Sequence, residues 1–597
     1  MFGVQCSRFF ITKPTFLAVS GSIHLDRTRF ISDSVAMLPL SKWFKQQSSW
    51  IESQQVSILS AAFIIVLANI ASAASGLVKN RVISSVYITE KYGNLLDAYW
   101  VAFRLPDFIY QILVLGLLSA AFVPLFSRLY KQNKDTAFAL ANQTLYATLG
   151  IFGLIALIVA LFTRQFVGFI TGPEFSPDQF EVAVRMTRIM LISQVLFAIS
   201  GFFSAMLQSA RRFVIPAFTP VFYNLGIILT VFLGTYTLGL YAAAWGTVVG
   251  ALLHMLIQVP LLWKLGFRWK LKVKWQSEHL KEIVEVTIPR TLTLVINQLH
   301  LFVLTFFATS LGNLSLTVMT FAQQLMTMPI RFFGVSIGQA ALPFLAASHD
   351  NELAMRRMVF RSIRQIVFFT APASALLLVL RVPVVRLAFG TDEFPWRTTL
   401  DTAMALGILS LSVMPQAVTH LLLRAFYARN NTRTPLLTAI AYSICTLVLS
   451  WFFVYQIHWG IAGLATALSL AATFETLSLL LLFLRAVPGN SLQQLWWSLF
   501  RLATASILMA VVLFVFQRLF DLYVFETSRT WQLIQLTAIV STLGAAVYIG
   551  LCWLLGVEEL TILQRLYEKV RHQWRRTISS SPDFVETVAS GVDTTDN

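Results

Sequence analysis

The feature that most constrains this chain is a succession of fourteen long apolar segments separated by short polar loops. They lie at roughly 57–78, 97–127, 138–163, 182–207, 214–237, 239–263, 283–311, 314–346, 362–385, 400–427, 435–456, 459–484, 497–517 and 532–556. A helix crosses a bilayer with about 20 apolar residues, and each segment allows that. Charged residues make up 12% of the chain, about half the share in soluble domains. We therefore expect an all-α polytopic membrane protein.

The basic residues of the loops indicate how the chain is oriented. Lys and Arg concentrate in alternate loops, such as 264–281 and 356–364, and in the stretch 565–576. Cytoplasmic loops are rich in these residues, which accounts for the net charge of +17 without a nucleic-acid partner. We predict that both termini are cytoplasmic and that the loops 171–180 and 386–400 lie outside.

Two common catalytic motifs are missing from the sequence. It contains no Walker A loop and no HExxH, so an energy-coupling ATPase or a hydrolase is not indicated. Cys6, Cys445 and Cys552 lie far apart, which favours neither a disulfide framework nor a metal site. We expect a protein that is not an enzyme and needs no cofactor.

The chain also repeats itself at a constant spacing of 219 residues, which we call the repeat offset. TGPEF at 171–175 matches GTDEF at 390–394, Pro124 matches Pro343, and Pro216 matches Pro435. Each half holds six crossings, an even number, so the halves share one orientation. This pattern predicts two six-helix lobes, related by an axis along the membrane normal, as in rocking transporters.

The predicted organisation has five parts. Residues 1–56 form an extension that is disordered or precedes the true start at Met37, 57–266 form the N-lobe, and 280–486 form the C-lobe. The stretch 495–556 adds two crossings outside the repeat. The tail, 557–597, begins with a basic amphipathic stretch suited to the membrane surface and ends in a disordered segment.

The second apolar segment carries the most informative charges. Asp97, Arg104 and Gln111 are spaced by seven residues, so a continuous helix places them on one face. Pro106 would kink that helix. Charges at membrane depth usually face a cavity and mark a transport pathway. The alternative is that Asp97 and Asp107 lie at the water interface, with Arg104 extending toward it.

Four further ionisable residues are candidates. Arg331 is the lone charge of the eighth segment, and Arg290 lies inside the seventh. His254 and Glu475 sit within apolar segments, separated by nearly the repeat offset, and are candidates for proton or cation coupling. The alternatives are interfacial arginines and, for His254 and Glu475, ordinary packing contacts.

Three stretches carry a family resemblance: DAYWVAFRLPDF (97–108), SARRFVIPAFTPVFYNLGII (209–228) and LRAFYARNNTRTP (423–435). With these, the chain over about 60–556 resembles the MurJ/MviN family, whose members are lipid II flippases of the bacterial plasma membrane. The wider group is the multidrug/oligosaccharidyl-lipid/polysaccharide exporter superfamily. The resemblance implies two lobes around a cationic cavity, a groove made with the last two crossings for a lipid tail, and alternating access.

The chain also departs from the family pattern. Several of the family's charged positions are occupied here by other residues, namely Ala73, Lys79, Asn80, Leu115, Gln323 and Gln324. Asp97, Arg104, Pro106 and Pro124 match. The resemblance thus implies a substrate cavity with Arg104, Asp97 and Lys79. Arg331, seven residues after Gln324, and Arg290 are candidates to replace the cavity charges that the family carries at other positions.

The leading hypothesis is a transporter that flips a lipid with a diphosphate-linked glycan headgroup, lipid II or a relative, within the bilayer. One alternative is an exporter of another glycolipid or of an ion-coupled amphiphile. The other is a degenerate flippase fold that acts as an envelope scaffold. The sequence leaves the sugar, the coupling ion and the oligomeric state open.

Overall fold

The computed structural model describes residues 58–89, 91–115, 122–270, 298–348, 351–391, 394–489, 492–525 and 529–561, with Leu118 and Val295. The expected N-terminal extension, most of the tail and Arg290 lie outside these residues. Every regular element in the described ranges is helical, which confirms the predicted fold class.

Ten helical stretches are long and apolar enough to cross a membrane. They are α5 (Lys134–Leu161), α7 (Pro177–Ser209), α8 (Val214–Leu238), α9–α10 (Tyr241–Lys264), α12–α13 (Ser315–Ala347), α14 (Glu352–Val379), α18 with its last turn (Arg433–Gln456), α19 (Gly460–Ala486), α20 (Leu492–Tyr523) and α21 (Thr530–Leu554). The bent pair α16 (Trp396–Ser410) and α17 (Val413–Ala428), with a 47° angle, makes an eleventh. The chain is therefore a multi-pass membrane protein.

The count of fourteen crossings is not confirmed by these criteria. The three remaining apolar segments coincide with α2 (Ile58–Tyr87), with the broken pair α3 (Leu96–Tyr110) and α4 (Val123–Gln132), and with the short helix Gln298–Thr309. Each expected segment thus has helix at its position, but these three are interrupted, short or only partly described.

The break in the second segment has a counterpart in the eighth. Helix α3 continues through Pro106 and changes to a π-helical turn at Gln111–Leu115. Helix α12 (Ser315–Pro329) changes to a π-helical turn at Ile330–Val335. Proline lacks the N–H that continues the α-helical ladder, and single π turns inside α-helices are rare and often lie at functional sites. The first residues of the two turns are separated by the repeat offset.

Helix boundaries follow the same repeat. Four pairs of described helices begin at positions separated by the repeat offset, namely α3 with α12, α7 with α16, α8 with α18, and α9 (Tyr241–Leu256) with α19. The left-handed residues Arg211 and Asn430, with φ of 59° and 55°, are related in the same way. The repeat predicted from the sequence is therefore present in the backbone, whereas the exact lobe boundaries stay a prediction.

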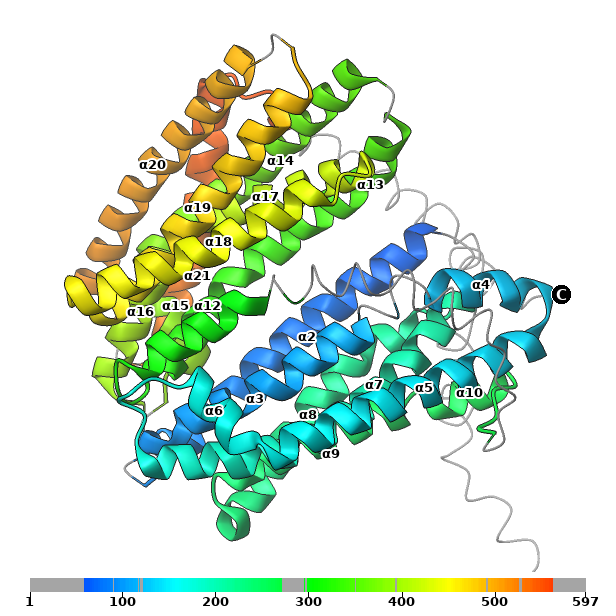
Figure 1. Cartoon of the computed structure of the whole chain (residues 1–597). Helices are drawn as coiled ribbons and strands as arrows, with labels where there is room; N and C mark the ends of the chain where they lie inside the picture. The colour runs from blue at the N-terminus through cyan, green and yellow to red at the C-terminus, as the bar shows by residue number, and fades with distance from the viewer. Residues whose placement is uncertain are drawn as a thin grey trace, which may run out of the picture. The chain divides into compact units, whose positions relative to one another are not determined.

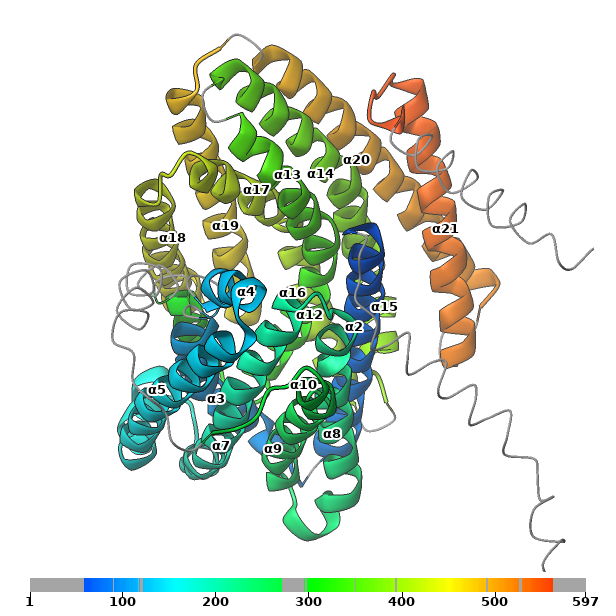
Figure 2. The ribbon, with the colours of Figure 1, turned by 90° about the vertical axis from the view of Figure 1, so that its right-hand side faces the viewer.

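The helices gather in two groups, and their described residues form three large apolar cores. Helices α2 to α10 form one group and α12 to α19 the other, and α20 and α21 lie beside α14 (Figures 1 and 2). One core lies within the first group, and a second joins the second group to α20 and α21. The third spans both groups around Leu96, Tyr99, Leu316 and Phe321. We call that region, where Asn94 and Asp97 meet Asn313 and Thr317, the joined end.

Candidate functional site

Helix α3 carries a polar row at the boundary between the two groups. Arg104 and Asp107 line a small pocket with Phe108 and with Gln298 of the helix Gln298–Thr309. Gln111 Nε2 donates to Asp107 Oδ2 at 2.8 Å, and Gln298 Nε2 donates to Gln111 Oε1. The row therefore connects a helix of the first half to a helix of the second.

Arg104 is the least satisfied member of this row. Its Nε and Nη2 atoms are buried and have no hydrogen-bond partner in the described part of the chain. Asp107, one turn along the helix, is the carboxylate that acts on it electrostatically, but that carboxylate accepts its hydrogen bond from Gln111. A buried guanidinium with unpaired donors is costly, so this site favours an anionic ligand.

Asp97 lies two turns away and is engaged elsewhere. Its Oδ1 accepts hydrogen bonds from the Thr317 backbone N at 2.8 Å and from Thr317 Oγ1 at 2.5 Å, and its Oδ2 accepts from the Leu316 backbone N at 3.4 Å. These N–H groups belong to the first turn of α12, where a carboxylate is stabilised by unpaired donors and by the helix dipole. The sequence placed Asp97 in the cavity with Arg104, whereas here it joins the two halves.

The joined end contains further contacts between equivalent residues. The side chains of Asn94 and Asn313, 219 residues apart, are hydrogen bonded at 3.3 Å, and Gln179 donates to the Asn94 carbonyl and to Asn313 Oδ1. Equivalent positions meet in this way along a two-fold axis. Gly172 N also donates to Thr309 Oγ1 at 2.8 Å.

Two positions at which this chain departs from the family pattern contact each other. Asn80 of α2, which is 2% exposed, donates from its side-chain amide to Gln324 Oε1 of α12. Asn224 of α8 donates to Ser75 Oγ at 2.9 Å. A neutral amide cluster thus stands where the resemblance implied charges. Lys79 lies beside it, half-buried, and no described residue pairs with it.

Arg331 lies in a cationic cluster with His420 and Arg424, separate from the polar row of Arg104. Its side chain is exposed at the start of the π-helical turn, so the α-helical face assumed from Gln324 ends just before it. Arg331 and Arg424 of α17 both act electrostatically on His420, and Arg424 Nη1 donates to the Val335 carbonyl at 2.7 Å. The structure therefore brings together Arg331 with two residues that were not proposed from the sequence.

His254 and Glu475 make contacts within their own halves. His254 Nδ1 is 2.6 Å from Ser200 Oγ, which also accepts from Gln258 Nε2 at 2.7 Å. This bonding matches the packing alternative. Glu475 of α19 is half-buried near Tyr442 of α18, and no described cation forms an ion pair with it.

Gln298 and Arg424 were not predicted from the sequence, and an interfacial position was only the alternative for Asp107, which lines the Arg104 pocket. Gln298 is an uncharged residue of the seventh segment, in which only Arg290 was a candidate. Arg424 lies four residues before the end of α17, a position typical of an interfacial arginine. Its i, i+4 spacing from His420 was the available signal. Among the described residues, no group of three or more His, Cys, Asp or Glu could hold a metal.

Comparisons with known proteins agree with the predicted family. A family model described as lipid II flippase MurJ matches residues 92–533. The probable lipid II flippase MurJ of Bdellovibrio bacteriovorus is 23% identical, with 87% of this chain and 99% of that protein covered. The lipid II flippase MurJ of Burkholderia cenocepacia is 26% identical, with 81% and 95% covered.

Solved structures share the fold. A structure of lipid II flippase MurJ in an inward closed conformation matches with a TM-score of 0.67 and 20% identity, covering 81% of this chain and 98% of that one. An inward-facing MATE family transporter of the MOP superfamily matches with a TM-score of 0.60 and 15% identity, covering 70% and 94%.

Proposed function

The chain belongs to the lipid II flippase MurJ family, and we propose that it moves lipid II, a polyprenyl-diphosphate-linked peptidoglycan precursor, across the bacterial plasma membrane. The family model covers most of the chain, and the relatives just described carry that name. The membrane-crossing helices in two repeated halves suit transport by alternating access.

The observation that carries this proposal is the state of Arg104. Two of its guanidinium nitrogens are buried without a partner in the described residues, beside a pocket at the boundary between the halves. A diphosphate supplies the missing acceptors, and the planar guanidinium fork binds phosphate oxygens in two places. In this proposal Lys79, Arg331 and Arg424 add positive charge around the headgroup, while Asp97 acts from the joined end.

The orientation proposed from the loop charges assigns the joined end to one side of the membrane. It would face the outside, and both termini would lie in the cytoplasm. The Arg104 site would then be reached from the cytoplasmic side. An impermeant thiol reagent should label Glu174→Cys in intact cells and Arg485→Cys only after lysis, and the reverse would contradict the orientation.

One observation favours the alternative functions, namely transport of a different lipid-linked substrate or a scaffold role. The amide pair Asn80–Gln324 lacks the charges that the family resemblance implies, which suits a lipid-linked substrate with another headgroup, or a scaffold. A scaffold has no need of a desolvated Arg104, and for that reason transport remains the proposal.

Complementation of a flippase-depleted bacterium tests the proposed transport of lipid II. The wild-type chain should restore growth, Arg104→Ala should not, and Arg104→Lys should restore it partly because an ammonium lacks the two-pronged geometry. Arg485→Ala, which removes an exposed arginine, is the matched control and should behave as wild type. Full growth with Arg104→Ala at normal membrane levels would contradict the proposal.

A further inference from the structure

A second cationic pocket lies far along the chain from Arg104, on the second half. Arg357, Arg361 and Arg364 occupy successive turns of one face of α14 and line a pocket with Gln494 and Leu495 at the start of α20. From this arrangement we infer a binding site for the phosphate group of an anionic phospholipid. The inference does not depend on which lipid the protein transports.

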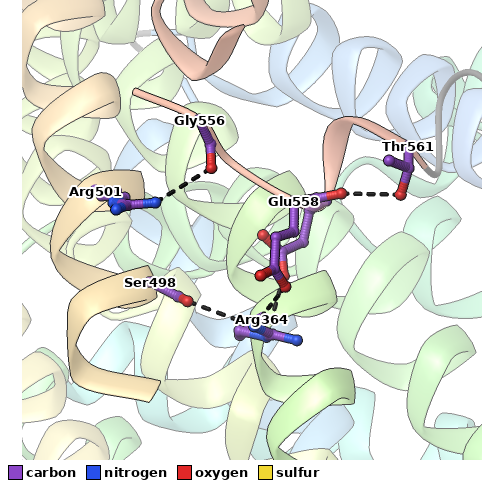
Figure 3. Close-up of polar contacts among 7 residues, drawn as sticks. Arg364, Ser498, Arg501, Gly556, Glu558 and Thr561 are labelled. Atoms are coloured by element: carbon purple, nitrogen blue, oxygen red, sulfur yellow. Dashed lines mark hydrogen bonds and ion pairs between the residues drawn. The ribbon is translucent and has the colours of Figure 1, made fainter. Parts of the chain in front are cut away.

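The pocket has charge that the described residues do not neutralise. Glu558 and Glu559, which follow α21, both pair with Arg364 at 3.1 Å, and Ser498 of α20 lies 3.5 Å from the same guanidinium (Figure 3). Arg361 has no ion pair or hydrogen bond with a described residue. Arg357 bonds only to the Leu353 carbonyl of its own helix, at 3.3 Å.

The two guanidinium groups without an ion pair are therefore held beside a third that is already paired. The first turn of α20 also brings backbone N–H groups with a positive helix dipole to the pocket. Three arginines and a helix N-terminus form a typical phosphate environment. Glu558 and Glu559 both pair with Arg364, so neither neutralises Arg357 or Arg361.

The surroundings identify the phosphate as that of a lipid. Trp496, Trp497 and Phe500 follow on α20 with exposed fractions of 55%, 57% and 62%, and Trp497 and Phe500 stack with centroids 5.7 Å apart. Exposed aromatic residues of this kind mark the headgroup level of a bilayer. The pocket thus lies where lipid phosphates are, on a face that the polar headgroup and the acyl chains can reach together.

The equivalent positions of the first half carry no charge. The positions that precede the three arginines by the repeat offset are Phe138, Asn142 and Leu145 of α5, and all three are buried. The basic face is therefore not a by-product of the repeat. It occurs where α14 packs against α20, a helix outside the repeat.

Binding of phosphatidylglycerol to the purified full-length protein tests the inference. Native mass spectrometry with phosphatidylglycerol or phosphatidylcholine in the detergent micelle would count bound lipid, and melting temperatures without lipid would report folding. We expect wild type to prefer phosphatidylglycerol, and Arg357→Gln with Arg361→Gln to weaken that binding by about tenfold or more, since two charge-assisted contacts are lost. The matched control, Arg433→Gln with Arg485→Gln, removes two exposed arginines outside the pocket and should keep the preference.

A second variant tests the same site in the opposite direction. Glu558→Gln with Glu559→Gln frees Arg364 and should strengthen phosphatidylglycerol binding by several-fold. Equal binding by wild type and the Arg357/Arg361 variant, an equal loss in the control, or no gain on freeing Arg364 would each overturn the inference. Competition by inorganic phosphate at the lipid's own concentration would overturn the lipid assignment and indicate a free-anion site.

Discussion

Asn80 and Gln324 show how this chain fills two charged positions of the family pattern with a hydrogen-bonded amide pair. The two side chains come from different halves, and Asn80, which is 2% exposed, donates to the half-buried Gln324. Each carries an amide where the resemblance implied a charge, one acidic and one basic. A buried ion pair and a buried amide pair are alternative ways to satisfy the same contact, whereas a single charge there is not.

This contact predicts strong coupling between the two positions. Asn80→Asp alone and Gln324→Arg alone should each lower stability by about 3 kcal/mol, because each buries a charge opposite a neutral partner. The double variant should recover much of the loss by forming an ion pair. Melting temperatures of the four purified proteins give the cycle, and strictly additive losses would show that the residues do not interact.

At the scale of elements, α8 and α9 approach each other closely through two glycines. A Cβ added to Gly226 would lie 2.5 Å from the Gly250 Cα, and one added to Gly250 would lie 2.5 Å from the Tyr223 carbonyl oxygen. Small residues at such interfaces let membrane helices approach closely. This contact keeps α8, which also packs on α2, fixed beside the amide cluster.

Enlarging either glycine should separate the two helices. Gly250→Ala should cost about 1–3 kcal/mol because the nearest atom is the backbone carbonyl oxygen of Tyr223, which cannot move aside. Gly153→Ala on α5, where nothing lies within 4 Å of the added Cβ, is the matched control and should be neutral or slightly stabilising. Thermal unfolding of both variants is the measurement, and an unchanged Gly250→Ala protein would contradict the close approach.

The elements also show what the sequence could and could not predict. Apolar length and the internal repeat predicted where helices lie, since both depend on local composition and spacing. The π-helical turns at Gln111 and Ile330 were not predicted, because prolines indicate a break but not its geometry. The partner of Asp97 was missed for a related reason: Thr317 is 220 residues away, and helical periodicity relates only residues on the same helix.

At the scale of the whole molecule, the joined end is the part that alternating access must open. Asp97 contributes a carboxylate to the first turn of α12, and Asn94 and Asn313 meet beside it. Polar contacts of this kind are each worth about 1 kcal/mol. Their loss is enough to shift a two-state equilibrium by several-fold.

Asp97→Leu should therefore favour the conformation in which the joined end is separated, and Asp97→Asn should do so less. The measurement is the yield of a short bismaleimide cross-link between Asn94→Cys and Asn313→Cys, with Cys6, Cys445 and Cys552 replaced. Asp178→Asn, which removes an exposed carboxylate from the first turn of α7, is the control. Equal yields for Asp97→Leu and the unchanged pair would mean that Asp97 does not hold the halves together.

In the proposed transport cycle, Arg104 is the residue that binds the diphosphate at the boundary between the halves. The most direct measurement is the affinity of purified wild type, Arg104→Lys and Arg104→Gln for lipid II, with undecaprenol as the ligand without phosphate. We expect a loss of about ten- to a hundredfold for Arg104→Gln, a smaller loss for Arg104→Lys, and no change for undecaprenol, because only the charge-assisted phosphate contact is removed. Equal lipid II affinity in wild type and Arg104→Gln would contradict the account.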